Sequence, residues 1–394
     1  MMNDLERAKT LYDELVENRR FLHTHPELGM NLPETTTFVQ TKLREMGIEP
    51  KLCGGSGVTA LIGGKKPGPV VLLRADMDAL PMREESGLPF ASTREAAHTC
   101  GHDLHATMLL GAAKLLKEEE DSLPGTVKLM FQPGEETLEG AKAMLADGIL
   151  ENPHVDAAFA CHMGPTAPCG YIAYRAGTVN TSSDNFFIEI TGKGGHGASP
   201  QKCIDPINTG VHIYLALQEL ISREKAPDDH VALTVGEFNA GHATNIIPKT
   251  ALLGVTLRTV NPETREYMKN RIQEIVEGVA KTYRCQAEIK PGGSTCAVTL
   301  DEECANTVGE AFTEVFGKGA GRINGRVDGS EDFGEVSSKV PSLFFLLGGA
   351  NPEEPEHYYG HHPRVRYDER SLPYGVAAYV CAAKAWLRAH AEQE

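Results

Sequence analysis

The chain has 394 residues, of which 41% are hydrophobic and 23% charged, and it carries a formal net charge of −16 at pH 7. This length indicates two or three domains with a large core, and the composition is that of an ordinary globular protein. The acidic balance argues against nucleic acid or an anionic membrane as a partner, and no apolar run approaches the ~20 residues that span a bilayer. The nine cysteines follow no regular spacing and no signal peptide is visible, which favours a reduced, cytoplasmic setting.

The first part of the chain is expected to alternate helices and strands. Apolar residues recur at helical period over residues 4–22, and Pro26 and Gly29 end this pattern. A second helix is expected over 34–46, ending at Gly47 as its C-cap. The next elements are predicted as strands over 58–62, 70–73, 126–131 and 155–161 and helices over 104–116 and 140–147.

Side chains that can bind metals follow three of these strands. Asp76 and Asp78 come after the apolar run 70–73, Glu135 and Glu136 come after 126–131, and His162 follows 155–161. In open α/β sheets, ligand sites lie at the carboxyl ends of the strands. Two adjacent carboxylates can also divide their roles, one binding metal and one acting as a general base. The sequence therefore predicts one shared site at this edge of the sheet.

A fourth source of ligand-type groups is the segment His98-Thr-Cys-Gly-His-Asp-Leu-His105, which enters the helix predicted over 104–116. It contains three imidazoles, a thiol and a carboxylate, all of which bind transition metals when deprotonated. Gly101 allows a tight turn between Cys100 and His102.

The order of elements then changes to β-α-β-β-α-β, the pattern of a ferredoxin-like unit. Its expected members are strands at 186–190, 230–238, 250–258 and 286–290, and helices at 204–223 and 262–283. The α/β pattern afterwards resumes with a helix at 301–315, a strand at 342–347 and a helix at 371–390. We therefore interpret the chain as an α/β domain formed by residues 1–180 and 293–394, with residues 181–292 inserted.

The motifs resemble one known family almost from end to end. It is the hippurate hydrolase, N-acyl-amino-acid amidohydrolase and auxin-conjugate hydrolase branch of the dinuclear-metal peptidases. The matching motifs, in order, are Arg20-Phe-Leu-His-Thr-His-Pro-Glu-Leu-Gly29, Arg74-Ala-Asp-Met-Asp-Ala-Leu-Pro81, Cys100-Gly-His-Asp103, Gln132-Pro-Gly-Glu-Glu136, Gly194-Gly-His-Gly-Ala-Ser-Pro200, Thr244-Asn-Ile-Ile-Pro248, Ser330-Glu-Asp-Phe333 and His361-His-Pro363.

The resemblance implies a mixed-sheet, metallopeptidase-like catalytic domain that binds two divalent transition metal ions (Zn, Mn, Co or Ni). The ligands it implies are Cys100, His102, Glu136, His162 and His361. Cys100 would bridge the two ions as a thiolate, and Glu135 would be the catalytic carboxylate. In related branches a His-x-Asp pair supplies a ligand where this chain has Asp76-Met-Asp78, so we interpret both aspartates as groups that orient His102 or a neighbour.

For the inserted segment, the resemblance implies a lid and dimerisation domain. His196 would stabilise the oxyanion of the transition state and, with Asn245, contact the substrate, while Arg258 is a looser candidate for holding a substrate carboxylate. A homodimer or higher homo-oligomer is implied in the same way. The other histidines are expected to pack, cap or face solvent, although His105, about one helical turn after His102, could support the site.

The expected reaction is hydrolysis of an N-acyl-L-amino acid, or of a short peptide, to a carboxylate and a free amine. A metallo-dipeptidase or carboxypeptidase is the alternative within this class. A metal-binding protein without catalysis is the alternative outside it, but that reading predicts a broken Glu pair or a missing ligand, and neither is seen.

Overall fold

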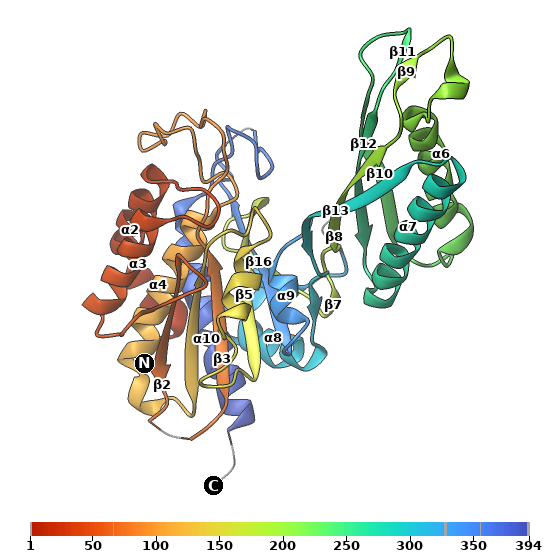
Figure 1. Cartoon of the computed structure of the whole chain (residues 1–394). Helices are drawn as coiled ribbons and strands as arrows, with labels where there is room; N and C mark the ends of the chain where they lie inside the picture. Colours follow the sequence, from red (N-terminus) through yellow and green to blue (C-terminus); the bar gives the residue numbers. More distant parts are fainter. Residues whose placement is uncertain (1, 66, 327–328, 355, 392–394) are drawn as a thin grey trace. The chain divides into compact units, whose positions relative to one another are not determined.

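The computed structural model describes residues 2–65, 67–326, 329–354 and 356–391 (Figure 1). These residues form two compact units, each with its own sheet. Unit 1 contains residues 2–179, 299–326 and 335–391, and unit 2 contains residues 180–298 and 329–334. Unit 2 extends beyond the expected limit of 292 because its last strand continues to Thr295.

Unit 1 is built on a mixed sheet whose strand order is β1-β2-β4-β3-β5-β16-β6-β15 in the described residues. The bounds of these strands are β1 Lys51–Cys53, β2 Gly57–Gly63, β3 Val70–Asp76, β4 Thr126–Gln132, β5 Ala157–Pro168, β6 Ile172–Tyr174, β15 Ala320–Arg322 and β16 Ser342–Ala350. The central strands β4, β3, β5 and β16 run parallel, and β2 and β6 pair antiparallel with this group. The expected α/β class with a large mixed sheet is confirmed. A short separate ladder joins β7 (Gly177–Thr178) to β14 (Thr299–Leu300).

Helices α4 and α10 pack on each other and on β3. The α-helices of the described residues are α1 Asp4–Thr10, α2 Tyr12–Thr24, α3 Pro33–Glu45, α4 His102–Glu118, α5 Gly140–Ala146, α6 Pro206–Glu219, α7 Pro262–Thr282, α8 Glu302–Phe316, α9 Phe333–Ser337 and α10 Leu372–His390. Every residue of β3 and β4 is buried, which explains why the stretches 70–73 and 129–131 are apolar without alternation. Within the described ranges, no helix combines the length and the apolar character needed to cross a membrane.

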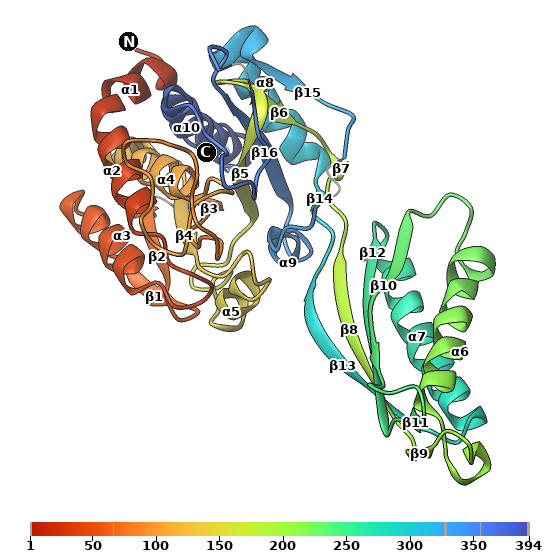
Figure 2. The ribbon, with the colours of Figure 1, turned by 90° about the horizontal axis from the view of Figure 1, so that it is seen from above.

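Unit 2 has the ferredoxin-like order that its sequence predicts. Its strands are β8 Ser183–Thr191, β10 Val231–Ala240, β12 Thr250–Thr259 and β13 Gln286–Thr295, and they form an antiparallel sheet in the order β10-β12-β8-β13. Helices α6 and α7 lie side by side on one face of this sheet (Figure 2). The core between them contains Ile188 of β8, Ile213 of α6 and Ile272 of α7. A separate two-stranded ladder pairs β9 (Gly195–His196) with β11 (Ile246–Ile247).

Two elements differ from their predictions in ways that have a local cause. The helix expected over 4–22 is interrupted at Leu11, next to Thr10, whose hydroxyl donates a hydrogen bond to the Arg7 carbonyl at 2.6 Å. Such hydroxyl-to-backbone bonds compete with regular helix geometry. The strand expected over 155–161 continues to Pro168, because β5 keeps pairing with β16. His162 therefore lies inside β5 and not after it.

Candidate metal centre

The loop that contains Cys100 turns sharply where it enters α4. Gly101 is the N-cap residue of α4 and has φ = +89°, a conformation that glycine adopts without a steric penalty. A Cβ at this position would lie 3.1 Å from the Cβ of Met163 and 3.2 Å from the Cζ of Tyr367. The turn and the close packing thus both require glycine, and the donor atoms of Cys100 and His102, on either side of it, lie within 4.8 Å of each other.

The adjacent glutamates that follow β4 are held by Asp78, which follows β3. The backbone N–H groups of Glu135 and Glu136 donate to Oδ1 and Oδ2 of Asp78 at 3.0 and 3.1 Å. One carboxylate thus fixes the turn that presents both glutamate side chains. Glu135 is buried, and its Oε2 lies 4.0 Å from Nε2 of His102.

The structure brings the five predicted ligands together. The donor atoms of Cys100, His102 and His162 lie within 4.8 Å of one another, and so do those of Cys100, Glu136 and His361. The Sγ of Cys100 is 3.5 Å from Nε2 of His162, and Nε2 of His361 is 3.3 Å from Oε1 of Glu136. The two groups of three share only the thiol, which is the arrangement that a thiolate bridging two ions requires.

The hydrogen-bond state of this cluster fits bound metal ions. Both ring nitrogens of His102 and Oε1 of Glu136 are buried and have no hydrogen-bond partner among the described residues. Burying such polar atoms without partners costs free energy, and metal coordination would remove that cost. Burial raises the pKa of the Cys100 thiol, but His162 and His102 outweigh it and lower this pKa to about 6. The thiolate form that metals bind is therefore accessible at neutral pH.

Asp76 is occupied by neighbouring side chains. Its Oδ2 accepts from Nη1 of Arg74 at 2.7 Å, and its Oδ1 faces Nδ1 of His105. Burial raises the pKa of Asp76, but Arg74 and the neighbouring histidines hold it well below its usual range. These contacts favour a supporting role over metal binding. The Oδ2 of Asp76 and the Oδ1 of Asp78 lie 3.8 and 3.6 Å from the two ring nitrogens of His102.

His105 links Asp76 to the strand that carries His162. The N–H of Met163 donates to Nε2 of His105 at 2.8 Å, so Nε2 is an acceptor and the ring proton lies on Nδ1, facing Asp76. Burial lowers the pKa of His105 to about 4, in spite of Asp76, so the ring is neutral. The expectation that His105 is close enough to support the site is met by this geometry.

Sequence reasoning missed the role of Arg74. A signal was present, because an arginine interrupts a fully buried apolar strand two residues before Asp76, and side chains two apart in a strand share a face. It also did not foresee that His361 has φ = +67°, which is strained for a residue with a Cβ. Such strain often occurs at functional sites. The backbone N–H of His361 is held by the carbonyl of Thr99, next to Cys100.

The three predicted substrate contacts all lie in unit 2, and two of them lie together. His196 of β9 pairs with Ile246 of β11, next to Asn245, and the N–H of Gly197 donates to the Asn245 carbonyl at 2.8 Å. Arg258 lies apart, on β12, where its Nη1 donates to Oγ of Ser330 at 3.0 Å.

The mixed sheet, the inserted βαββαβ unit and the shared-thiol donor cluster are together those of a metal-dependent hydrolase. The chain belongs to peptidase family M20/M25/M40, which its residues 72–385 match. It is similar to an IAA-amino acid hydrolase (ILR1-like 2) of Arabidopsis thaliana, with 38% identity over 99% of this chain and 89% of the relative. It is also 36% identical to an N-acetyl-L-cysteine deacetylase of Bacillus subtilis, over 92% and 86% of the two chains.

A solved structure of a relative extends this likeness to the fold. A dinuclear metal binding peptidase of the M20 family from Bacillus subtilis superposes with a TM-score of 0.81 at 33% identity, covering 96% of this chain and 99% of that one. The family expected from the sequence motifs is thus confirmed.

Proposed function

We propose that this chain cleaves N-acyl-L-amino acids into a carboxylate and a free amino acid, using two divalent metal ions held by Cys100, His102, Glu136, His162 and His361. The observation that carries the proposal is the pair of donor groups that share the Cys100 thiol beside the buried Glu135. The two relatives named above are an IAA-amino acid hydrolase and an N-acetyl-L-cysteine deacetylase, and both names describe cleavage of an N-acyl amino acid.

The chain supplies a proton acceptor for this reaction. When bound, the metal ions would lower the pKa of water and polarise the scissile carbonyl. Glu135 takes the proton of the attacking water and delivers it to the leaving amine, a role for which a fixed, buried carboxylate is suited. Asp78 keeps Glu135 and Glu136 in fixed relative positions through their backbone amides. Thiolate and imidazole donors favour zinc, manganese, cobalt or nickel over magnesium or calcium.

His196 is proposed to donate a hydrogen bond to the oxyanion of the transition state. The N–H of Ala198 donates to Nδ1 of His196 at 3.1 Å, so the ring proton lies on Nε2, which is free to donate. We expect His196→Ala to lower kcat by about 10²–10³-fold, as loss of one oxyanion donor does in other hydrolases. Steady-state kinetics would measure this, with His242→Ala, another exposed histidine of unit 2, as the control. Equal kcat values for the two variants would contradict the assignment.

Arg258 and Asn245 are proposed to hold the substrate, and Arg258 would bind the carboxylate of the substrate. Arg258 is half-buried, and no carboxylate of the described residues lies within ion-pair distance of it. Burial lowers its pKa. A partly desolvated guanidinium without an anionic partner is suited to bind a carboxylate from solution.

A substrate panel separates this function from its alternatives. N-acetyl and N-benzoyl amino acids should be cleaved in the presence of manganese, zinc, cobalt or nickel, and dipeptides with a free amino terminus should be poor substrates. Preference for dipeptides would instead indicate a metallo-dipeptidase or carboxypeptidase. Failure across the panel with metal bound would indicate a metal-binding protein without this activity.

We propose that the chain forms homodimers through unit 2. The outer face of α6 exposes Val211, Tyr214 and Leu215, with Leu215 56% exposed, and β10 is an edge strand of the unit 2 sheet. Exposed apolar side chains beside an open sheet edge are typical of an association surface.

All nine cysteines are unpaired, which supports the reducing, cytoplasmic setting proposed from the sequence.

Replacing Leu215 by glutamate is therefore expected to convert the dimer to a monomer, because a buried, unpaired carboxylate opposes association. Light scattering coupled to size-exclusion chromatography measures the mass. Leu61→Glu, on an exposed position of β2 in unit 1, is the matched control and should leave the dimer intact. A monomeric wild-type protein, or a dimeric L215E variant, would refute this interface.

A further inference from the structure

A buried network of charged side chains joins α2 to the start of α4, outside the metal centre. It consists of Arg19 and His23 from α2, Glu84 from the loop after β3, and Asp103 in the first turn of α4. The side chains of these four residues are at most 5% exposed. Asp103 directly follows His102, so the network lies one residue from a proposed metal ligand.

The contacts in this network are short and specific. Nε of Arg19 and Nδ1 of His23 both lie 2.8 Å from Oδ2 of Asp103. On the other side of the His23 ring, Nε2 lies 3.0 and 3.1 Å from the two oxygens of Glu84. The N–H of Ser92 fixes that carboxylate by donating to it at 2.7 Å.

This geometry determines the protonation state of His23. Ionised carboxylates only accept hydrogen bonds, and both ring nitrogens face a carboxylate, so both must carry a proton. The imidazolium and the Arg19 guanidinium then face the charges of Asp103 and Glu84. Nη1 of Arg19 also lies 3.1 Å from Oε1 of Glu369, a carboxylate that is paired in turn with Arg20. Burial alone lowers the pKa of His23, but Asp103 and Glu84 outweigh it and raise this pKa above its ordinary value. The nearby His98 is buried and neutral, because burial lowers its pKa to about 3.

We propose that His23, as an imidazolium, is a positioning residue for the metal centre. By holding Asp103 it fixes the first turn of α4, and with it the His102 ring and the adjoining Cys100 turn. Without the charge of His23, Asp103 would lose one of its two cationic partners inside the protein and shift toward water. This inference rests on the assignment of Cys100 and His102 as metal ligands in the proposed function.

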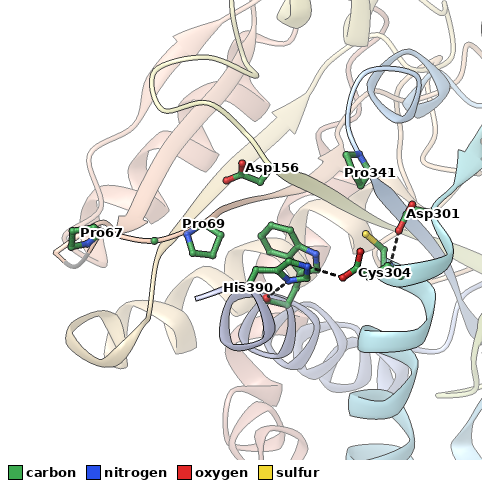
Figure 3. Close-up of a pocket in the computed structure, with 10 residues that line it drawn as sticks. Pro67, Pro69, Asp156, Asp301, Cys304, Pro341 and His390 are labelled. Atoms are coloured by element: carbon green, nitrogen blue, oxygen red, sulfur yellow. Dashed lines mark hydrogen bonds and ion pairs between the residues drawn. The ribbon is translucent and has the colours of Figure 1, made fainter. Parts of the chain in front are cut away.

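The test compares cobalt(II) affinity, measured by calorimetry on the full-length protein, for the wild type and two histidine variants. His23→Gln keeps hydrogen-bonding capacity but removes the charge, and we expect cobalt affinity to fall about 10- to 100-fold, as for other residues that support metal ligands. His390→Gln is the control. Both ring nitrogens of His390 also have partners, with Nε2 3.2 Å from Glu303 and Nδ1 2.9 Å from the Trp386 carbonyl, but its side chain is more exposed than that of His23 (Figure 3).

The control lies far from the metal centre within the same unit. The pocket in Figure 3 is lined by Pro69, Asp156 and Pro341, which directly precede β3, β5 and β16. The pocket therefore lies at the amino-terminal ends of these strands, whereas Asp76 is at the carboxyl end of β3 and His162 lies further along β5. H390Q should bind cobalt as the wild type does. A similar loss of cobalt affinity in both variants would show that His23→Gln acts by general destabilisation, and it would overturn the proposal.

A double-mutant cycle tests the route of the effect. If His23 acts through Asp103, then His23→Gln should add little to the loss caused by Asp103→Asn, and additive losses would overturn the route. If H23Q does not fold, NMR of histidine-¹⁵N-labelled wild-type protein decides instead. The imidazole signals of His23 are identified as those that move in the Glu84→Gln variant. They must show that both ring nitrogens are protonated at neutral pH, and a ring with a single proton would overturn the proposal.

These readouts also distinguish this inference from the proposed function. If the wild-type protein binds cobalt but cleaves no amide, the proposed substrate class is wrong. The comparison of cobalt affinities between the wild type and the variants then still tests the role of His23. A wild-type protein that binds no cobalt overturns both.

Discussion

Replacing Glu135 by glutamine is expected to lower kcat for N-acyl amino acid hydrolysis by about 10²–10⁴-fold, the usual contribution of a general acid–base group. The amide has the shape of the carboxylate but cannot accept the proton of the attacking water. The backbone N–H of Glu135, which anchors the turn to Asp78, is unaffected by the change. Because the five proposed metal ligands are also untouched, the metal content measured by mass spectrometry should equal that of the wild type.

Glu139→Gln is the matched control for this prediction. Glu139 lies four residues further along the chain and is exposed, and among the described residues its side chain accepts a hydrogen bond only from Thr137. E139Q should retain wild-type kcat. Near-normal turnover by E135Q with full metal content would show that another group accepts the proton.

Cys100→Ser should lose bound metal and lower kcat/KM by at least about 100-fold. The thiol is the only donor shared by the two groups of ligands, so its loss weakens both metal positions at once. Metal ions acting as Lewis acids contribute several kcal/mol to catalysis, and each 1.4 kcal/mol corresponds to a factor of ten in rate. A serine hydroxyl does not ionise near neutral pH and replaces the thiolate poorly.

Cys169→Ser provides the comparison for C100S, since both cysteines are partly buried. Burial raises the pKa of the Cys169 thiol to about 12, opposite in direction to that of Cys100. Among the described residues, Cys169 belongs to no group of side chains that could hold a metal ion. C169S should keep both metals and full activity. If C100S also kept two metal ions per chain and wild-type activity, the thiol would not be the bridge.

The sequence predicted the elements whose pattern is local. The unbroken apolar run at Val70–Leu73 correctly indicated a strand buried on both faces, and the βαββαβ order correctly indicated the fold of unit 2. The three-residue strands β6 and β15 were missed, because they are too short for a period to show and are formed by pairing with distant strands.

The same distinction holds for the site. Each proposed ligand belongs to a recognisable sequence motif, so the residue types of the ligands and their order along the chain could be predicted. The structure places all five together. The contacts that support the ligands could not be predicted from the sequence. Asp103 and its partner Arg19 are 84 residues apart, and Arg74 and Gln132 are 58 residues apart. Such pairs depend on how α2, α4, β3 and β4 pack, which no local pattern encodes.

The position of β16 between β5 and β6 has a consequence for synthesis of the chain on the ribosome. β5 and β6 are close in sequence, but β16 follows only after all of unit 2 has been made. Until then β5, whose first half is buried, has no partner on one side, and its apolar residues, such as Phe159, are open to contact with other chains. His361 follows β16, so the set of proposed metal ligands is also completed only after unit 2 has been made. A nascent chain should therefore need chaperone protection until β16 has emerged, and all five proposed metal ligands are available only once His361 has followed it.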